Sequence, residues 1–269
     1  MIQSLDRAMT ILSILEQKNT ASVTEIAEEL GVNKSTVSRL METLKKHDMV
    51  QADPATKKYG LGFKILYLGE GVKRNINIIT IARPFLTKLY DELDESVHLC
   101  AFNNDAAYVV DQVQSNKVYN LSATVGMAEP PHSSSVGKCI LAFRPPFPAV
   151  RLLKDYPLTA YTPKTITDMD ILMEQLAIIR SQGYAVDDEE IALGVRCIAA
   201  PIYDYRGEVN YSLGVSGTTN NIKPSAMDRY LSALLSASSQ ISSALGYKCG
   251  RQSPEVQPPG PYGDSGRDE

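Results

Sequence analysis

The sequence predicts an α+β protein of two domains, and three observations lead to that prediction. The chain has 269 residues, which is more than one typical domain needs. Short helical patterns followed by a hairpin signal fill its beginning, whereas strands and helices are interspersed later. We therefore expect an N-terminal domain at 1–65, a linker helix at 66–81 and a C-terminal domain at 82–248. Residues 249–269 are rich in Pro, Gly and charge, which predicts a disordered tail.

The first predicted helix covers residues 4–17. Its apolar residues recur every three or four positions, which is the spacing of one helix face. The face expected to point inward consists of Leu5, Ala8, Ile11, Leu12 and Leu15.

Two further short helices are joined by a tight turn. Ser22 and Glu25 have the spacing of a capping box at the start of the second helix. Gly31 suits a left-handed helix end, and Asn33 suits the cap of a third helix over residues 34–47. This is the helix-turn-helix pattern, in which the second helix of the pair enters the major groove of DNA.

A hairpin is predicted after the third helix, over residues 49–62, with two lysines in its turn. Together with the helices it forms a winged helix-turn-helix, which predicts binding to double-stranded DNA. Hydroxyls can meet phosphates or base edges, and an arginine can fork onto guanine. The predicted DNA-contacting residues are Lys34, Ser35, Thr36, Ser38, Arg39, Lys57 and Lys58.

Charge is distributed unevenly within the net charge of −4. Residues 31–75 carry 9 Lys and Arg against 4 Asp and Glu, whereas residues 76–269 carry 16 against 22. A polyanion such as DNA is therefore attracted to the first stretch and repelled by the second.

Composition argues against several other classes of protein. There is no run of eighteen apolar residues and no signal-peptide core, so we expect a cytoplasmic protein without membrane contact. Cys100, Cys139, Cys197 and Cys249 form no C-x-x-C pair. They are expected to be thiols in a reducing compartment, with no metal site and no cofactor.

The C-terminal domain is predicted to mix antiparallel strands with helices, as sensor domains do. Strands are expected at 97–102, 108–113, 118–122, 196–203 and 209–216. Helices are expected at 82–93, with Pro84 in the first turn, and at 135–143, 168–182 and 224–245. Residues 127–133 are expected to form a loop.

Three stretches of the chain resemble the IclR family of bacterial transcription regulators. They are GVNKSTV at 31–37, PHSSSVGK at 131–138 and GYAVDDEEIALGVRCIAAPIYDYRGEVNYSLGVSG at 183–217. The resemblance covers about residues 1–248. It implies a homodimer or homotetramer that binds palindromic operators, and a GAF-like C-terminal domain that holds a small effector, commonly an organic acid.

The resemblance also implies an effector pocket. A helix beginning near Ser135 favours an anion at its N-terminus, where Ser135 and Ser216 can donate hydrogen bonds. Asp187 can accept a hydrogen bond, and Val118 and Met127 are expected to form an apolar wall. The pocket residues expected are Val118, Met127, Ser135, Val136, Asp187, Val195, Cys197 and Ser216. A serine is frequent in the family at position 214, so Gly214 removes a possible donor.

These observations predict a ligand-responsive regulator, preferably a repressor of a catabolic operon. Few aromatic residues are expected around the pocket, which favours a sugar acid or another hydroxylated carboxylate over an aromatic acid. Two other classes are left open. One is an enzyme using Cys197 or Ser216, including a Cys197–His132 pair. The other is a sensor whose helix-turn-helix contacts only protein.

Overall fold

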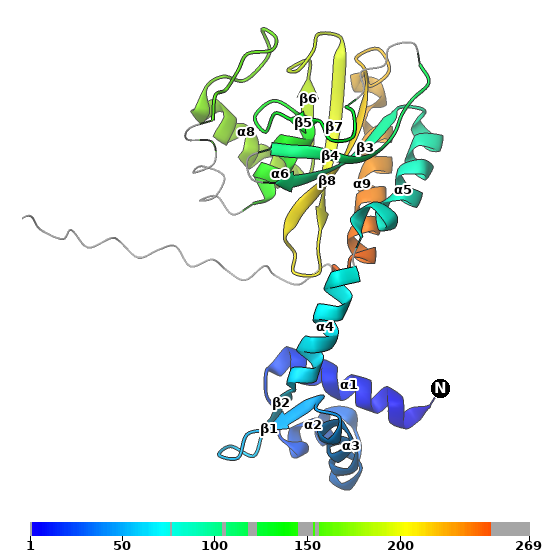
Figure 1. The fold of residues 1–269 in the computed structure, drawn as a ribbon, viewed down its shortest axis with the longest axis vertical. Coiled ribbons are helices and arrows are strands. Elements are labelled where there is room, and N and C mark those ends of the chain that lie inside the picture. The colour runs from blue at the N-terminus through cyan, green and yellow to red at the C-terminus, as the bar shows by residue number, and fades with distance from the viewer. Residues whose placement is uncertain are drawn as a thin grey trace, which may run out of the picture. The chain divides into compact units, whose positions relative to one another are not determined.

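The computed structural model describes residues 2–75, 77–103, 106–117, 123–144, 153 and 156–248 (Figure 1). The chain divides into two compact units, Met1–Ile76 and Asn77–Glu269. The strand predicted at 118–122 and the tail predicted at 249–269 lie outside the described residues.

The first unit is helical with a small hairpin. Strand β1 pairs with β2 in antiparallel register, with Val50 opposite Leu61. The elements are α1 (Gln3–Lys18), α2 (Val23–Leu30), α3 (Lys34–Lys46), β1 (Val50–Ala52), β2 (Tyr59–Leu61) and α4 (Phe63–Asn75). The order confirms the winged helix-turn-helix predicted from the sequence.

The local sequence explains where α2 begins and ends. The Ser22 hydroxyl accepts the backbone N–H of Glu25, and the Glu25 carboxylate accepts the N–H of Ser22, as the capping-box spacing predicts. Gly31 ends the helix with φ of 63°. Asn33 precedes α3 as predicted, although its side chain makes no capping hydrogen bond to a described residue.

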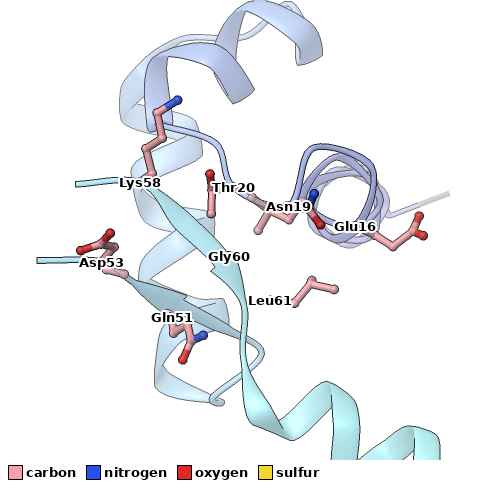
Figure 2. Close-up of a pocket in the computed structure, with 10 residues that line it drawn as sticks. Glu16, Asn19, Thr20, Gln51, Asp53, Lys58, Gly60 and Leu61 are labelled. Atoms are coloured by element: carbon pink, nitrogen blue, oxygen red, sulfur yellow. The ribbon is translucent and has the colours of Figure 1, made fainter. Parts of the chain in front are cut away.

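The core of the first unit is formed by apolar side chains from α1, α2, α3 and β1. Ile11, Ile26 and Val37 are fully buried within it. The prediction for Leu5 is wrong: this side chain is 53 % exposed, because α1 packs through its second half. Figure 2 shows β2 running beside the end of α1, where a hollow of about 370 Å³ lies between the helix and the hairpin.

The helices near the unit boundary differ from the prediction. Instead of one linker helix over 66–81, the structure has α4, which ends at Asn75, and α5 (Ile78–Leu93). Asn77 starts α5, since its side-chain oxygen accepts the N–H groups of Ile79 and Thr80. Pro84 therefore lies inside α5 rather than in its first turn.

The second unit is built on an antiparallel sheet with strand order β5-β4-β3-β8-β7-β6. Its strands are β3 (Ser96–Asn103), β4 (Ala106–Val113), β5 (Ala128–Glu129), β6 (Ala185–Asp188), β7 (Val195–Tyr203) and β8 (Val209–Thr218). Its other helices are α6 (Ser135–Phe143), α8 (Met169–Gln182), the 3-10 helix η1 (Pro224–Ala226) and α9 (Met227–Ala244). Strand β5 lies where a loop was predicted, and β6 was not predicted.

Helices cover both faces of this sheet (Figure 1). Leu99, Leu213 and Val215 point to the face covered by α5 and α9. Cys100 and Ala199 point to the opposite face, where α6 and α8 pack. Within the part of the chain that the structure describes, no helix has both the length and the apolar character needed to cross a bilayer.

Candidate functional site

The first surface of interest is the start of α3. Lys34, Ser35 and Arg39 are exposed, and Thr36 and Ser38 are half-buried. The opposite side of the helix carries the buried Val37, Met41 and Leu44. The side chains predicted to contact DNA therefore lie on the outward face of the recognition helix, where a double helix can reach them.

Arg7 of α1 is a candidate that the sequence did not reveal. It lines an open hollow of about 680 Å³ together with Lys34 and Thr36. Glu28 of α2 also lines this hollow, so the cationic groups there face one acid. The neighbourhood of Arg7 and Lys34 results from the packing of α1 against the helix-turn-helix, which a local pattern in the sequence does not contain.

The two lysines of the wing have different surroundings. Lys57, with φ of 58°, is exposed in the turn, and no ion pair is recorded for it with a described residue. Lys58 directly precedes strand β2, and its ammonium group is 3.1 Å from a Glu25 carboxylate oxygen. Figure 2 shows the Lys58 side chain pointing from the hairpin towards the helices. Lys57 therefore offers an uncompensated positive charge, whereas the charge of Lys58 is partly balanced.

The second site is a cavity of about 570 Å³ in the C-terminal unit, at the N-terminus of α6. It is lined by His98, Ala123, Met127, Ala128, Glu129, Pro130, Ser134, Ser135, Val136, Tyr161, Asp187, Ile191, Ala192, Val195, Cys197 and Ser216. The structure thus brings together every predicted pocket residue except Val118, which lies outside the described residues.

Three of these residues form a row across the sheet. Asp187 on β6 is directly opposite Cys197 on β7, and Cys197 is opposite Ser216 on β8. Directly opposed residues of antiparallel strands point to the same face. The register therefore delivers a carboxyl, a thiol and a hydroxyl to one wall of the cavity.

The first turn of α6 supplies donors to the same cavity. Ser134 caps the helix, because its hydroxyl accepts the N–H of Gly137 at 3.1 Å and donates to the Pro130 carbonyl at 2.7 Å. The first N–H groups of a helix have no carbonyl partner within it, and the helix dipole is positive there. The backbone at Ser135 and Val136 is accordingly suited to a carboxylate or another anion.

Titratable groups in the cavity are shifted towards their uncharged forms. Burial raises the pKa of Asp187 to about 7, although its carboxylate accepts the Glu190 N–H at 2.7 Å. Burial also raises the pKa of Glu129 and that of the Cys197 thiol, and it lowers the pKa of His98 to about 4. Among the described lining residues there is no Lys or Arg, so an anion would rely on dipoles and hydroxyls.

The idea of a Cys197–His132 catalytic pair finds no support in this geometry. His132 is not among the residues lining the cavity; its Nε2 is hydrogen-bonded to the Thr159 carbonyl at 3.0 Å, and its ring stacks on Tyr161. Cys197 has a raised pKa and is a thiol rather than a nucleophilic thiolate. Nor do three or more metal-type ligands cluster anywhere in the described ranges.

Sequence reasoning missed His98, Glu129 and Tyr161 as lining residues. His98 had no local signal, because only the pairing of β3 with β8 places it opposite Gly214 in the cavity wall. Glu129 and Tyr161 had no such signal either, since they come from an unpredicted edge strand and from a long connection.

Comparisons with known proteins decide the family. The model of the IclR helix-turn-helix domain matches residues 4–54, and that of the bacterial transcriptional regulator IclR C-terminal domain matches residues 71–243. The chain belongs to the IclR family of transcriptional regulators. It is a DNA-binding regulator with an effector-binding domain and not an enzyme. Because bacterial DNA lies in the cytoplasm, the protein acts there.

Curated relatives match along almost their whole length. The regulator XynR of Escherichia coli is 31 % identical over 247 residues, which cover 91 % of this chain and 98 % of XynR. The regulator BhcR of Paracoccus denitrificans is 32 % identical, covering 90 % of this chain and 86 % of BhcR. The transcriptional repressor IclR of Escherichia coli is 31 % identical, with coverages of 91 % and 90 %.

Solved structures agree with the fold. The crystal structure of the Thermotoga maritima IclR is 31 % identical, covers 92 % of this chain and 100 % of that chain, and has a TM-score of 0.62. That of Pseudomonas aeruginosa HmgR is 26 % identical with the same coverages and a TM-score of 0.76.

Proposed function

We propose that this regulator represses a catabolic operon. Its effector is a small hydroxylated carboxylate of the sugar-acid type, and binding of the effector lowers or otherwise alters the affinity of the regulator for DNA. The observation that carries this proposal is the composition of the cavity, which combines a helix N-terminus, serine hydroxyls and buried carboxyls. Repression is supported by the 31 % identity to a relative named a transcriptional repressor.

The effector's carboxylate is assigned to the first turn of α6. The backbone N–H groups there and the Ser135 and Ser216 hydroxyls can donate hydrogen bonds to it. The effector's hydroxyls are assigned to Asp187 and Glu129, since carboxyl oxygens accept hydrogen bonds from alcohols. The proposed contacts are Met127, Ser135, Val136, Asp187, Val195, Cys197 and Ser216, with Val118 remaining a prediction.

An aromatic acid is the weaker candidate. It would need flat apolar walls, and Tyr161 is the one Phe, Tyr or Trp side chain among the described residues that line the cavity. Polar groups from β6, β7 and β8 occupy the wall that a ring would need.

DNA binding is assigned to α3 and the wing. Arg39 is expected to read bases, because a guanidinium can fork onto guanine, and the hydroxyls of α3 and the wing lysines are expected to contact phosphates. The proposed contacts are Lys34, Ser35, Thr36, Ser38, Arg39, Lys57 and Lys58.

A homodimer on a palindromic operator is the proposed assembly. Its support is apolar surface on the first unit. Ile2, which directly precedes α1, and Leu5 and Met9 of α1 are more than half exposed, at 69 %, 53 % and 51 %. Phe63 and Tyr67 of α4 are 78 % and 63 % exposed. Burying these side chains against a second copy removes them from water.

The test is DNase footprinting on the DNA upstream of the regulator's own gene, with and without a panel of small acids. We expect a protected two-fold symmetric site, affinity that falls steeply with salt, and loss or change of protection with a hydroxylated acid. Sedimentation of the free protein distinguishes a dimer from a tetramer. Failure to protect any site at low salt would contradict operator binding, and a response to aromatic acids alone would contradict the effector class.

A further inference from the structure

His98 and Gly214 are neighbours in the cavity wall, and the His98 ring fills the space beside Gly214. The two residues are opposite each other on β3 and β8. A Cβ atom at position 214 would lie 2.3 Å from His98 Nε2 and 2.6 Å from Cε1, which is closer than such atoms approach. The imidazole ring therefore occupies the place that any side chain at position 214 would need.

The ring is buried without a hydrogen-bond partner from the protein. His98 is 5 % exposed and lines the cavity, and the structure records no hydrogen bond from either ring nitrogen to a described residue. Neither ring nitrogen is among the completely buried polar atoms that lack a partner, so the ring is open to whatever occupies the cavity. Because burial lowers the pKa of His98 to about 4, the ring is neutral and carries one N–H donor and one acceptor nitrogen. A ligand with a polar group at this point would satisfy it.

The position of Val136 indicates which part of a bound ligand would face the His98 ring. The same Cβ position at 214 is 2.8 Å from Val136 Cγ1, so the ring meets the first turn of α6 at this point. With the carboxylate at the N–H groups of that turn, as proposed above, the carbon that adjoins it is the one expected beside the ring. The substituent on that carbon is therefore the part of the ligand within reach of His98.

On the basis of the function proposed above, we propose that His98 is a specificity-determining residue that hydrogen-bonds a hydroxyl on the carbon adjoining the effector's carboxylate. A hydroxyl both donates and accepts, so it satisfies whichever ring nitrogen faces the cavity, whereas an oxo group only accepts. The imidazole thus replaces the donor that a serine at position 214 would supply.

The test measures binding to the full-length protein by calorimetry, using acids that differ by one hydroxyl. The pairs are lactate with propionate, glycerate with 3-hydroxypropionate, threonate with 3,4-dihydroxybutyrate, and gluconate with 2-deoxygluconate. For at least one pair we expect the 2-hydroxy acid to bind about tenfold more tightly, which corresponds to about 1.4 kcal/mol. The 2-oxo counterpart of that acid, which can only accept a hydrogen bond, should bind no more tightly than the 2-hydroxy form.

Two variants of His98 separate hydrogen bonding from shape. His98→Leu removes donor and acceptor, so the tenfold preference should disappear while affinity for the deoxy acid stays within about twofold. His98→Gln keeps an amide donor and acceptor and should restore part of the preference. Unchanged preference in His98→Leu, or a 2-oxo acid that binds more tightly than the 2-hydroxy acid, would overturn the assignment.

A measurement on the wild-type protein covers the case in which a variant does not fold. The chain has 3 histidines, so the ring nitrogens of ¹⁵N-histidine-labelled protein can be resolved by NMR. The 2-hydroxy acid should shift one His98 ring nitrogen, and its deoxy partner should leave that signal in place. No shift with a bound 2-hydroxy acid refutes the contact. If no acid of the panel binds while operator binding persists, the proposed effector class fails, and this assignment fails with it.

Discussion

Lys138 and Glu190 form an ion pair that is shielded from water in the C-terminal unit. The side chain of Lys138 is completely buried, and that of Glu190 is 9 % exposed. The ammonium group also donates to the Val186 carbonyl at 2.8 Å. The hydrogen bond therefore links α6 to β6, and the ion pair links α6 to the turn that contains Ile191 and Ala192, two residues that line the cavity.

We expect Lys138→Met to destabilise the second unit by about 3–5 kcal/mol, because it leaves the Glu190 carboxylate buried without its counter-charge. Unfolding in urea, followed by far-UV circular dichroism, measures the change. The matched control is Lys138→Met with Glu190→Leu, which should recover most of the loss since no buried charge remains. A single variant as stable as the wild type would mean that the pair contributes nothing.

Stability should also depend on pH through Asp187. Its folded pKa of about 7 lies above the usual value near 4, so between these values the native protein holds a proton that the unfolded chain has released. Stability therefore falls as pH rises through this window, by at most about 1.4 kcal/mol per pH unit from this group. Above pH 7 this contribution is constant.

The difference between wild type and Asp187→Asn isolates that effect from Glu129 and Glu190, whose pKa values are also raised by burial. Asparagine keeps an oxygen that can accept the Glu190 N–H. Urea midpoints at pH 5, 6, 7 and 8 should fall with pH more steeply in the wild type than in the variant. Parallel profiles would show that Asp187 is ionised throughout this range.

Local signals in the sequence predicted the helices well. The capping box of Ser22 and Glu25, the ends at Gly31 and Gly183, and α6 at Ser135–Phe143 depend on neighbours within a few residues. The sequence could therefore predict the DNA-binding unit almost completely. Leu5 is one exception, because the spacing that marks an inward face also fits an apolar face left exposed. The linker helix predicted at 66–81 is another, since α4 already ends at Asn75.

The cavity was harder to predict because it depends on contacts between distant segments. Strand β6 is defined by its pairing with β7, and the partner of Lys138 is 52 positions further along the chain. The consequence of Gly214 depends on register: only the pairing with His98 shows that the missing side chain is replaced by an imidazole. The family resemblance supplied most pocket residues, whereas their electrostatics required the structure.

The wing lysines should differ in their effect on DNA binding. Lys57→Ala should weaken binding to all sequences and reduce the slope of log affinity against log salt by about one, as expected for one lost phosphate contact. Lys58→Ala should change the slope less, because its ammonium group already pairs with Glu25. Fluorescence anisotropy with a labelled duplex over a range of salt gives both slopes. Equal slopes for the two variants would contradict the assigned difference.

Arg39 is expected to discriminate between sequences, and two substitutions test this. Arg39→Ala should weaken operator binding by about 1–3 kcal/mol if the guanidinium forks onto a base. Arg39→Lys keeps the positive charge but loses the planar fork. It should therefore retain binding to an unrelated duplex and still lose most of the operator preference. Competition between operator and unrelated DNA of equal length measures both affinities. If either variant lost the same factor on both duplexes, Arg39 would be a phosphate contact, and base recognition would have to come from the hydroxyls of α3.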